Sequence, residues 1–157
     1  MTAIKTIVVA VDFSDIVGDV VRTACAVADK VQTKMHLITV VPDPIRQAWS
    51  TEVPGLDFEA IHSRWQEEAE TRMGEVLPLV TLHPAQLTHA VLTGVPDHEI
   101  VHYAKEHGAD LIVVGTHGYG PFKRLILGSV ADRVIRQAPC AVLTVPPSAH
   151  QAQEGQG

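Results

Sequence analysis

The stretch Ile7-Val8-Val9-Ala10-Val11-Asp12 is an apolar run that ends abruptly at a carboxylate. A second stretch, Leu111-Ile112-Val113-Val114-Gly115, has the same character and ends at a glycine. Short continuous runs of β-branched and aliphatic residues are typical of strands that are buried on both faces, as in a parallel sheet covered by helices. The two runs therefore predict central strands of an α/β domain.

Three further segments have strand character, and helical patterns separate them. The apolar stripe from Val17 to Val31, with Ser14 as its expected cap, and a longer stripe from Phe58 to Val76 predict two helices. Pro96 and Ser129 each open another helix. Because strand and helix alternate, we expect a three-layer α/β/α sandwich around a five-stranded parallel sheet. The expected strands are Thr6–Val11, Met35–Val41, Gln86–Leu92, Leu111–Val114 and Ala141–Val145.

Length and composition limit the classes of function. The chain has 157 residues and a formal net charge of −6, which argues against nucleic acid or an anionic membrane surface as a partner. We expect one domain, residues 1–147, with a loop at 42–54, and a disordered tail rich in Gln and Gly, residues 148–157. Cys25 and Cys140 have no pairing pattern, and the apolar run that begins at Ile7 is too short for a signal-peptide core. These features predict a cytoplasmic protein.

A spaced set of glycines follows the fourth expected strand. Gly115 and Gly118 are followed, after nine residues, by Gly128 and Ser129, in the pattern G-x2-G-x9-G-S. Glycines let a phosphate approach the backbone closely, and the free N–H groups at a helix start point at an anion. Ser129 adds a hydroxyl donor and Val130 a backbone amide. The pattern predicts a phosphate site that needs no net positive charge, beyond the carboxyl ends of the strands.

These stretches resemble the universal stress protein family over nearly all of the chain before the tail. The likeness rests on residues 7–12, 94–96, 108–118, 128–129 and 138–142. It implies a Rossmann-like sheet of strand order 3-2-1-4-5, of the adenine nucleotide alpha hydrolase-like type. It also implies ATP as the ligand, with Mg²⁺ or Mn²⁺ bound to its phosphates.

The resemblance assigns a role to each site residue by way of the family's ATP-binding branch. It implies that Asp12 hydrogen-bonds the ribose, that Gly115 lies beside the ribose, and that the backbone near Val40 reads the adenine edge, with Val41 as the alternative register. Asp12 and Val40 both fall at carboxyl ends of expected strands, so the residue pattern and the resemblance agree on one site. The residues implied around the phosphates are Gly118, Gly128, Ser129 and Val130.

Several of these residues have a simpler interpretation. Asp12 alone is also typical of a turn. Lys123 and Arg124 either reach a phosphate or belong to a solvated loop, and His117 has no partner as a base, which favours an exposed loop histidine. The other histidines show no metal-ligand pattern, so we assign no separate metal site.

The preferred function is a regulatory ATP-binding module that an unidentified protein reads. The alternatives are a slow ATP hydrolase of the same fold and a structural dimer that does not use nucleotide. We expect no enzyme, because the sequence has no Walker A motif, no G-x-G-x-x-G fingerprint and no visible pair of base and nucleophile. The strand Ala141–Val145 is an apolar sheet edge without charge, which predicts a homodimer through this strand, and the resemblance points the same way.

Overall fold

The computed structural model describes residues 3–28, 32–47, 55–116 and 127–148. Within them, strands and helices alternate as the sequence predicts. The strands are β1 (Thr6–Ala10), β2 (Lys34–Val41), β3 (Leu87–Thr93), β4 (Leu111–Gly115) and β5 (Ala141–Val145). The helices are α1 (Val17–Val27), α2 (Pro44–Gln47), α3 (Phe58–Val76), α4 (Pro96–Glu106) and α5 (Ser129–Gln137), and short 3-10 turns at Leu77–Leu79 and Pro84–Gln86 precede β3.

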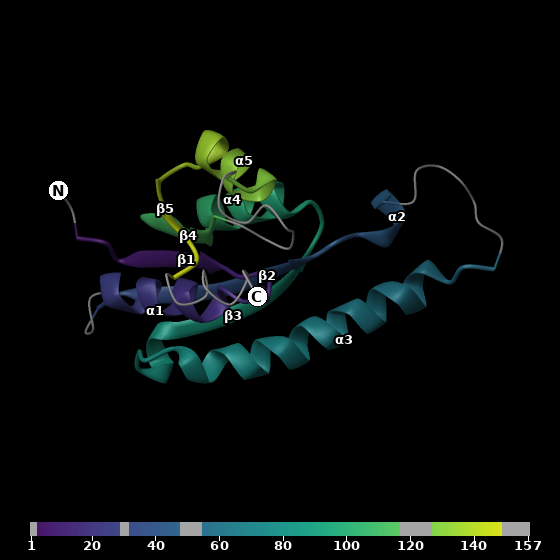
Figure 1. Ribbon diagram of the computed structural model, residues 1–157, viewed down its shortest axis with the longest axis horizontal. Helices are drawn as coiled ribbons and strands as arrows, with labels where there is room; N and C mark the ends of the chain where they lie inside the picture. Colours follow the sequence, from purple (N-terminus) through teal and green to yellow (C-terminus); the bar gives the residue numbers. More distant parts are fainter. Residues whose placement is uncertain (1–2, 29–31, 48–54, 117–126, 149–157) are drawn as a thin grey trace, which may run out of the picture.

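The five strands form one parallel sheet in the order β3-β2-β1-β4-β5. This confirms the predicted three-layer sandwich and its strand order. Figure 1 shows α4 and α5 on one face of the sheet and α1 and α3 on the other. Each face has its own buried cluster, with Ile7 and Met73 in one, and Ile112 and Val134 in the other. The core therefore consists of two apolar layers separated by the sheet.

Two segments between the strands differ from the prediction. Residues 42–54, expected as a loop, contain the short helix α2. The apolar stripe predicted up to Val31 is shorter, since α1 ends at Val27 and Ala28 has an extended backbone with ψ of 132°. Val27 is 39% exposed, so the buried face of α1 ends with Ala24. Residues 29–31 lie outside the described part of the chain.

The start of α1 does not use the cap that the sequence predicts. Ile16 occupies the N-cap position, and no side chain caps the helix. The Ser14 carbonyl accepts a hydrogen bond from the Val17 N–H at 3.0 Å. The Ser14 hydroxyl is buried and has no hydrogen-bond partner in the described part of the chain. The prediction was wrong because α1 begins at Val17, which leaves Ser14 two positions before the cap.

Ser14→Ala should therefore change the free energy of unfolding by less than about 0.5 kcal/mol, or raise it, because the lost hydroxyl has no partner. Loss of a true cap costs about 1 kcal/mol. Asp57→Ala is the matched control, since the Asp57 carboxylate caps α3 by accepting from the Ala60 N–H at 3.0 Å. Urea unfolding of both variants measures the difference. Equal losses of stability would show that Ser14 caps α1 after all.

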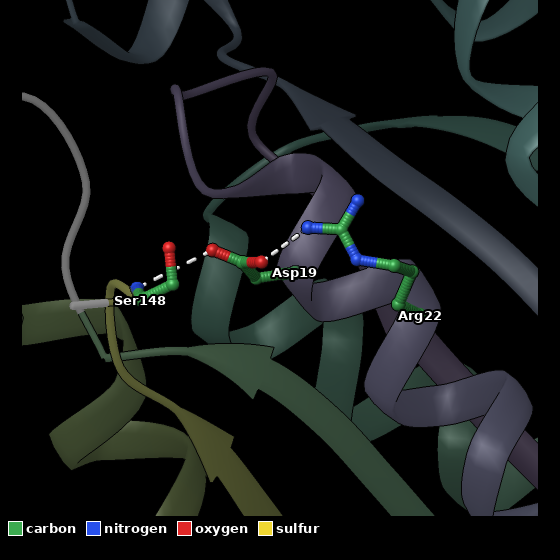
Figure 2. Close-up of polar contacts among 3 residues, drawn as sticks. All are labelled: Asp19, Arg22 and Ser148. Carbon is green, nitrogen blue, oxygen red and sulfur yellow. Dashed lines mark hydrogen bonds and ion pairs between the residues drawn. The ribbon is translucent and has the colours of Figure 1, made fainter. Parts of the chain in front are cut away.

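After β5 the chain crosses to the first turn of α1. The Ser148 N–H donates to Asp19 Oδ2 at 3.4 Å, and the other carboxylate oxygen of Asp19 pairs with Arg22 (Figure 2). A carboxylate in the first turn of a helix is also favoured by the helix dipole. Ser148, which the sequence assigned to the tail, is thus held against α1, and residues 149–157 lie outside the described residues.

A cluster of rings joins β2 to α4 near the amino ends of the strands. The Nδ1 atom of His36 lies 3.0 Å from the Tyr103 hydroxyl oxygen, and the Tyr103 and His107 rings stack with centroids 3.9 Å apart. Burial lowers the pKa of His36 below its usual value of 6.5, and the nearby His107 and Lys34 lower it further. The native state therefore favours neutral His36.

The free energy of unfolding should consequently fall as the pH drops below about 6.5, because the unfolded chain takes up a proton at His36 more readily than the native chain. This contribution is fully present above the unfolded pKa and is lost as the pH falls towards the lowered native pKa. Urea unfolding at about pH 7.5 and about pH 5.5 measures the effect. His36→Gln should reduce the pH dependence, and an unchanged dependence in the variant would contradict this assignment.

Candidate functional site

A cavity of about 470 Å³ opens at the carboxyl edge of the sheet, between the ends of β1 and β4, where the strand order reverses. Doubly wound sheets bind ligands at this position, and small-molecule sites measure roughly 300–1,000 Å³. The apolar walls come from both faces of the sheet, with Val17 and Val20 from α1 and Pro96 and Ile100 from α4. The other lining residues are Ala10, Val11, Asp12, Thr39, Val40, Val114, Gly115, Thr116, Gly128, Ser129, Val130 and Ala131.

The structure brings the predicted site residues of the described chain together around this cavity. Those residues are Asp12, Val40, Gly115, Gly128, Ser129 and Val130. Gly118, the remaining predicted residue, lies outside the described residues, as do His117, Lys123 and Arg124. The roles that the resemblance implies for these residues stay predictions.

The amino end of α5 opens into the cavity. The first helical hydrogen bond runs from the Asp132 N–H to the Gly128 carbonyl at 2.9 Å, and no side chain caps the helix. The N–H groups of Ser129, Val130 and Ala131 therefore have no acceptor within the helix, and all three residues line the cavity. This arrangement of N–H groups, with the helix dipole behind them, favours an anion.

Val40 presents its backbone to the cavity. The pairing of β1 with β2 ends at Ala10 and Ile38, and the Val11 N–H still donates to the Ile38 carbonyl at 2.9 Å. Backbone polar groups alternate between the two sides of a strand, so the N–H and C=O of Val40 point the same way as those of Ile38, past the end of β1. Val41 faces β3, where its carbonyl accepts from the Gly94 N–H at 3.0 Å. Val40, and not Val41, thus offers a donor and an acceptor to the cavity.

Asp12 sits in a tightly constrained turn after β1. The Ser14 N–H donates to Asp12 Oδ1 at 3.1 Å, which makes an Asx-type turn. Phe13, between them, has a φ of 60°, a left-handed conformation that costs a bulky side chain roughly 1–2 kcal/mol. Thr39 Oγ1 donates to the Val11 carbonyl at 2.8 Å and ties the residue before Asp12 to β2. The Ser14 N–H thus orients the Asp12 carboxylate, and the Thr39 hydroxyl anchors the backbone that precedes it.

A hydrogen bond of Thr116 joins the end of β4 to the start of α5. The Gly128 N–H donates to the Thr116 carbonyl at 2.6 Å, so the chain that leaves β4 at Thr116 returns to it before α5. The Thr116 N–H in turn donates to the Val145 carbonyl of β5 at 3.0 Å. These two bonds fix the start of α5 beside the end of β4.

Gly115 has a packing role that the sequence did not predict. A Cβ atom at this position would lie 2.6 Å from Ile16 Cδ1, a side chain buried at the start of α1. A side chain at position 115 would therefore force Ile16 Cδ1 to shift at the start of α1, apart from any ligand. For this reason a substitution at Gly115 would disturb packing as well as the cavity, and it is a poor test of binding.

Thr39, Thr116 and the apolar walls of the cavity were not predicted from the sequence. The wall residues Pro96 and Ile100 belong to patterns that predicted a helix, and helical spacing does not reveal which residues lie at a cavity mouth. Thr39 gave no signal because threonine inside a strand is ordinary. Its contact with the Val11 carbonyl depends on how β1 ends.

Side-chain clusters elsewhere offer no metal site in the part of the chain that the structure describes. His98 Nε2 lies 3.6 Å from Asp97 Oδ2, and His102 Nε2 lies 3.3 Å from Glu106 Oε1, each as a single pair. Among the described residues, no three His, Cys, Asp or Glu side chains gather as metal ligands would. The helices within the same residues are also too short or too polar to cross a membrane.

Proteins of known family resemble this chain in sequence and in fold. Residues 3–146 match the sequence model of the Universal stress protein family. A universal stress protein of Methanocaldococcus jannaschii is 33% identical over 147 residues, which cover 90% of this chain and 81% of that protein. Another, from Thermus aquaticus, is 33% identical over 144 residues, covering 90% of this chain and 98% of that protein. The chain therefore belongs to the universal stress protein family.

Solved structures of the family superpose over most of the chain. UspA from Lactobacillus plantarum has a TM-score of 0.76 and 28% identity, covering 92% of this chain and 99% of its own. A universal stress protein solved in complex with cAMP has a TM-score of 0.60 and 26% identity, covering 94% and 100%. One from Archaeoglobus fulgidus, in complex with dAMP, has a TM-score of 0.65, but at 24% identity it bears on the fold alone.

Proposed function

We propose that this universal stress protein binds ATP in the cavity between β1 and β4 and acts as a regulatory nucleotide-binding module. The observation that carries the proposal is the uncapped start of α5, which directs its N–H groups into the cavity that Asp12 and Val40 also line. Phosphates need such donors in a chain whose formal net charge is −6. The relative solved with cAMP supports an adenine nucleotide as the ligand class.

Different groups that line the cavity bind different parts of the nucleotide. The N–H groups of Ser129 and Val130 and the Ser129 hydroxyl hold the phosphates, with Mg²⁺ or Mn²⁺ carried by the nucleotide. Asp12 accepts hydrogen bonds from the ribose hydroxyl groups. The Val40 N–H and C=O match the ring nitrogen and the amino group on one edge of adenine. Guanine presents the reverse pattern on that edge, so the same backbone groups disfavour GTP.

We further propose that the protein binds ATP without a catalytic role. In this proposal it is a cytoplasmic homodimer paired through β5, and an unidentified protein recognises its nucleotide-bound state. Among the described residues that line the cavity, Asp12 is the only titratable side chain, and this proposal assigns it to the ribose. The second candidate, slow ATP hydrolysis, would need a group from residues 117–126, which lie outside the described residues. The third candidate function is that of a structural dimer that does not use nucleotide.

The first test is calorimetry with ATP and GTP. We expect ATP to bind more tightly than GTP to the wild-type protein. Asp12→Ala should weaken ATP binding by about 1.5–3 kcal/mol, or about 10- to 150-fold, because hydrogen bonds to a charged acceptor are lost. The variant should then bind ATP and 2′,3′-dideoxy-ATP about equally.

Two results would count against this assignment. Equal or absent binding of ATP and GTP by the wild-type protein would remove the proposed function. An Asp12→Ala protein that still prefers ATP over the dideoxy nucleotide would place the ribose contact elsewhere. Cyclic AMP and AMP, titrated in parallel, decide whether the triphosphate is the preferred ligand.

A further inference from the structure

Thr39 occupies a special position where the pairing of β1 and β2 stops. The residue lies in β2 and is only 4% exposed, and its Oγ1 donates to the Val11 carbonyl at 2.8 Å. The Val11 N–H donates to the Ile38 carbonyl at 2.9 Å, so both polar groups of the Val11 backbone turn towards β2. Val11 is itself buried, which makes a partner for its carbonyl necessary.

A regular parallel ladder would supply a different partner for that carbonyl. The next donor in register, two residues after Ile38, is the Val40 N–H. The pairing of β1 with β2 does not continue to Val40. The Thr39 hydroxyl occupies the position at the Val11 carbonyl that the Val40 N–H would fill in a regular ladder. A single side chain thus ends the ladder one step early and leaves the Val40 N–H directed at the cavity, which Val40 lines.

We infer that Thr39 is a positioning residue for adenine recognition: its hydroxyl satisfies the Val11 carbonyl and so keeps the Val40 N–H available for the base. This inference rests on the proposed function. It also explains why a polar side chain is buried between apolar neighbours at this point of β2, where Ile38 and Val41 are buried as well. Without the hydroxyl, the next donor in register for the Val11 carbonyl is the Val40 N–H, and pairing with it would take this N–H away from the base.

The test uses Thr39→Val, which removes the hydroxyl and keeps the shape, beside Thr39→Ser, which keeps the hydroxyl. Amide hydrogen exchange, followed by NMR in the nucleotide-free protein, shows which backbone N–H groups of β2 are hydrogen-bonded. The Val40 amide should exchange faster than the Ile38 amide in the wild type and in Thr39→Ser. In Thr39→Val it should become protected. A Val40 amide that is already protected in the wild type would overturn the inference.

Calorimetry then reads the consequence for binding. Thr39→Val should bind ATP about tenfold more weakly, which is the size of one hydrogen bond to a buried partner. Its affinity for GTP should fall less, so the ratio of ATP affinity to GTP affinity decreases. Thr39→Ser should keep both affinities. An unchanged ratio in Thr39→Val would overturn the inference even if affinity drops, because a purely structural loss weakens both nucleotides alike.

The two measurements separate this inference from the proposed function. If the wild-type protein binds neither nucleotide, the proposed function fails, and adenine positioning fails with it, while the exchange data still decide whether Thr39 ends the ladder. If ATP binds and the exchange rates of Val40 do not respond to Thr39→Val, the function stands and the inference fails. Should the valine variant not fold, Thr39→Ala against Thr39→Ser gives the same comparison.

Discussion

Gly128→Val should lower the affinity for ATP by about 100-fold or more, which corresponds to a loss of about 2.7 kcal/mol, while the domain stays folded. Gly128 is the N-cap of α5 and lines the cavity beside the N–H groups that are proposed to hold phosphate. A branched Cβ there occupies space that the phosphates need. The φ of Gly128 is −58°, which valine tolerates, so the expected effect comes from bulk and not from backbone strain.

A matched control separates this loss from a general cost of replacing glycine. Gly74 lies on α3, and a Cβ placed on it would meet no atom within 4 Å, so Gly74→Val adds the same side chain to an open surface. Circular dichroism and the melting temperature should show that both variants are folded, and calorimetry should show ATP binding by Gly74→Val only. Retained affinity in a folded Gly128→Val protein would remove α5 from the phosphate site.

The sheet was predictable from the sequence because its signals are local. The runs at Ile7 and Leu111 are continuous and apolar, as strands buried on both faces must be, and the structure places both in the interior of the sheet, as β1 and β4. The cap of α1 was not predictable in the same way. A serine before an apolar stripe is a common cap, but α1 begins only at Val17, three residues after Ser14, and residue type alone does not show this delay.

The candidate site was predictable only where residue type carries the signal. The glycines and Ser129 have a recognisable spacing, and Asp12 ends an apolar strand, so these residues could be named in advance. The register between Val40 and Val41 needed the structure, because it depends on which side of β2 faces the end of β1. Thr39 and Thr116 act through contacts with residues 28 and 29 positions away, and no local pattern encodes such contacts.

A substitution in β5 tests the proposed homodimer only if it removes an N–H group that points away from the sheet. The Val145 carbonyl accepts from Thr116, so it points towards β4. Backbone groups alternate along a strand, and therefore Leu143 also faces β4, whereas Val142 and Thr144 direct their N–H groups away from the sheet. Proline at Leu143 would remove a hydrogen bond inside the sheet and destabilise the fold. Proline at Thr144 removes a donor from the open edge alone.

Thr144→Pro should accordingly convert the dimer to a folded monomer at low micromolar concentration, because an edge that pairs with a second copy loses a ladder donor, and proline is tolerated on edge strands. Thr144→Val is the matched control, since it keeps the N–H and should stay dimeric. Sedimentation velocity gives the mass of each species, and circular dichroism confirms the fold. Because Thr116 links Val145 to Gly128, ATP titration of the monomer also shows whether pairing at β5 affects the cavity. A Thr144→Pro protein that is folded and fully dimeric would place the interface on another surface of the domain.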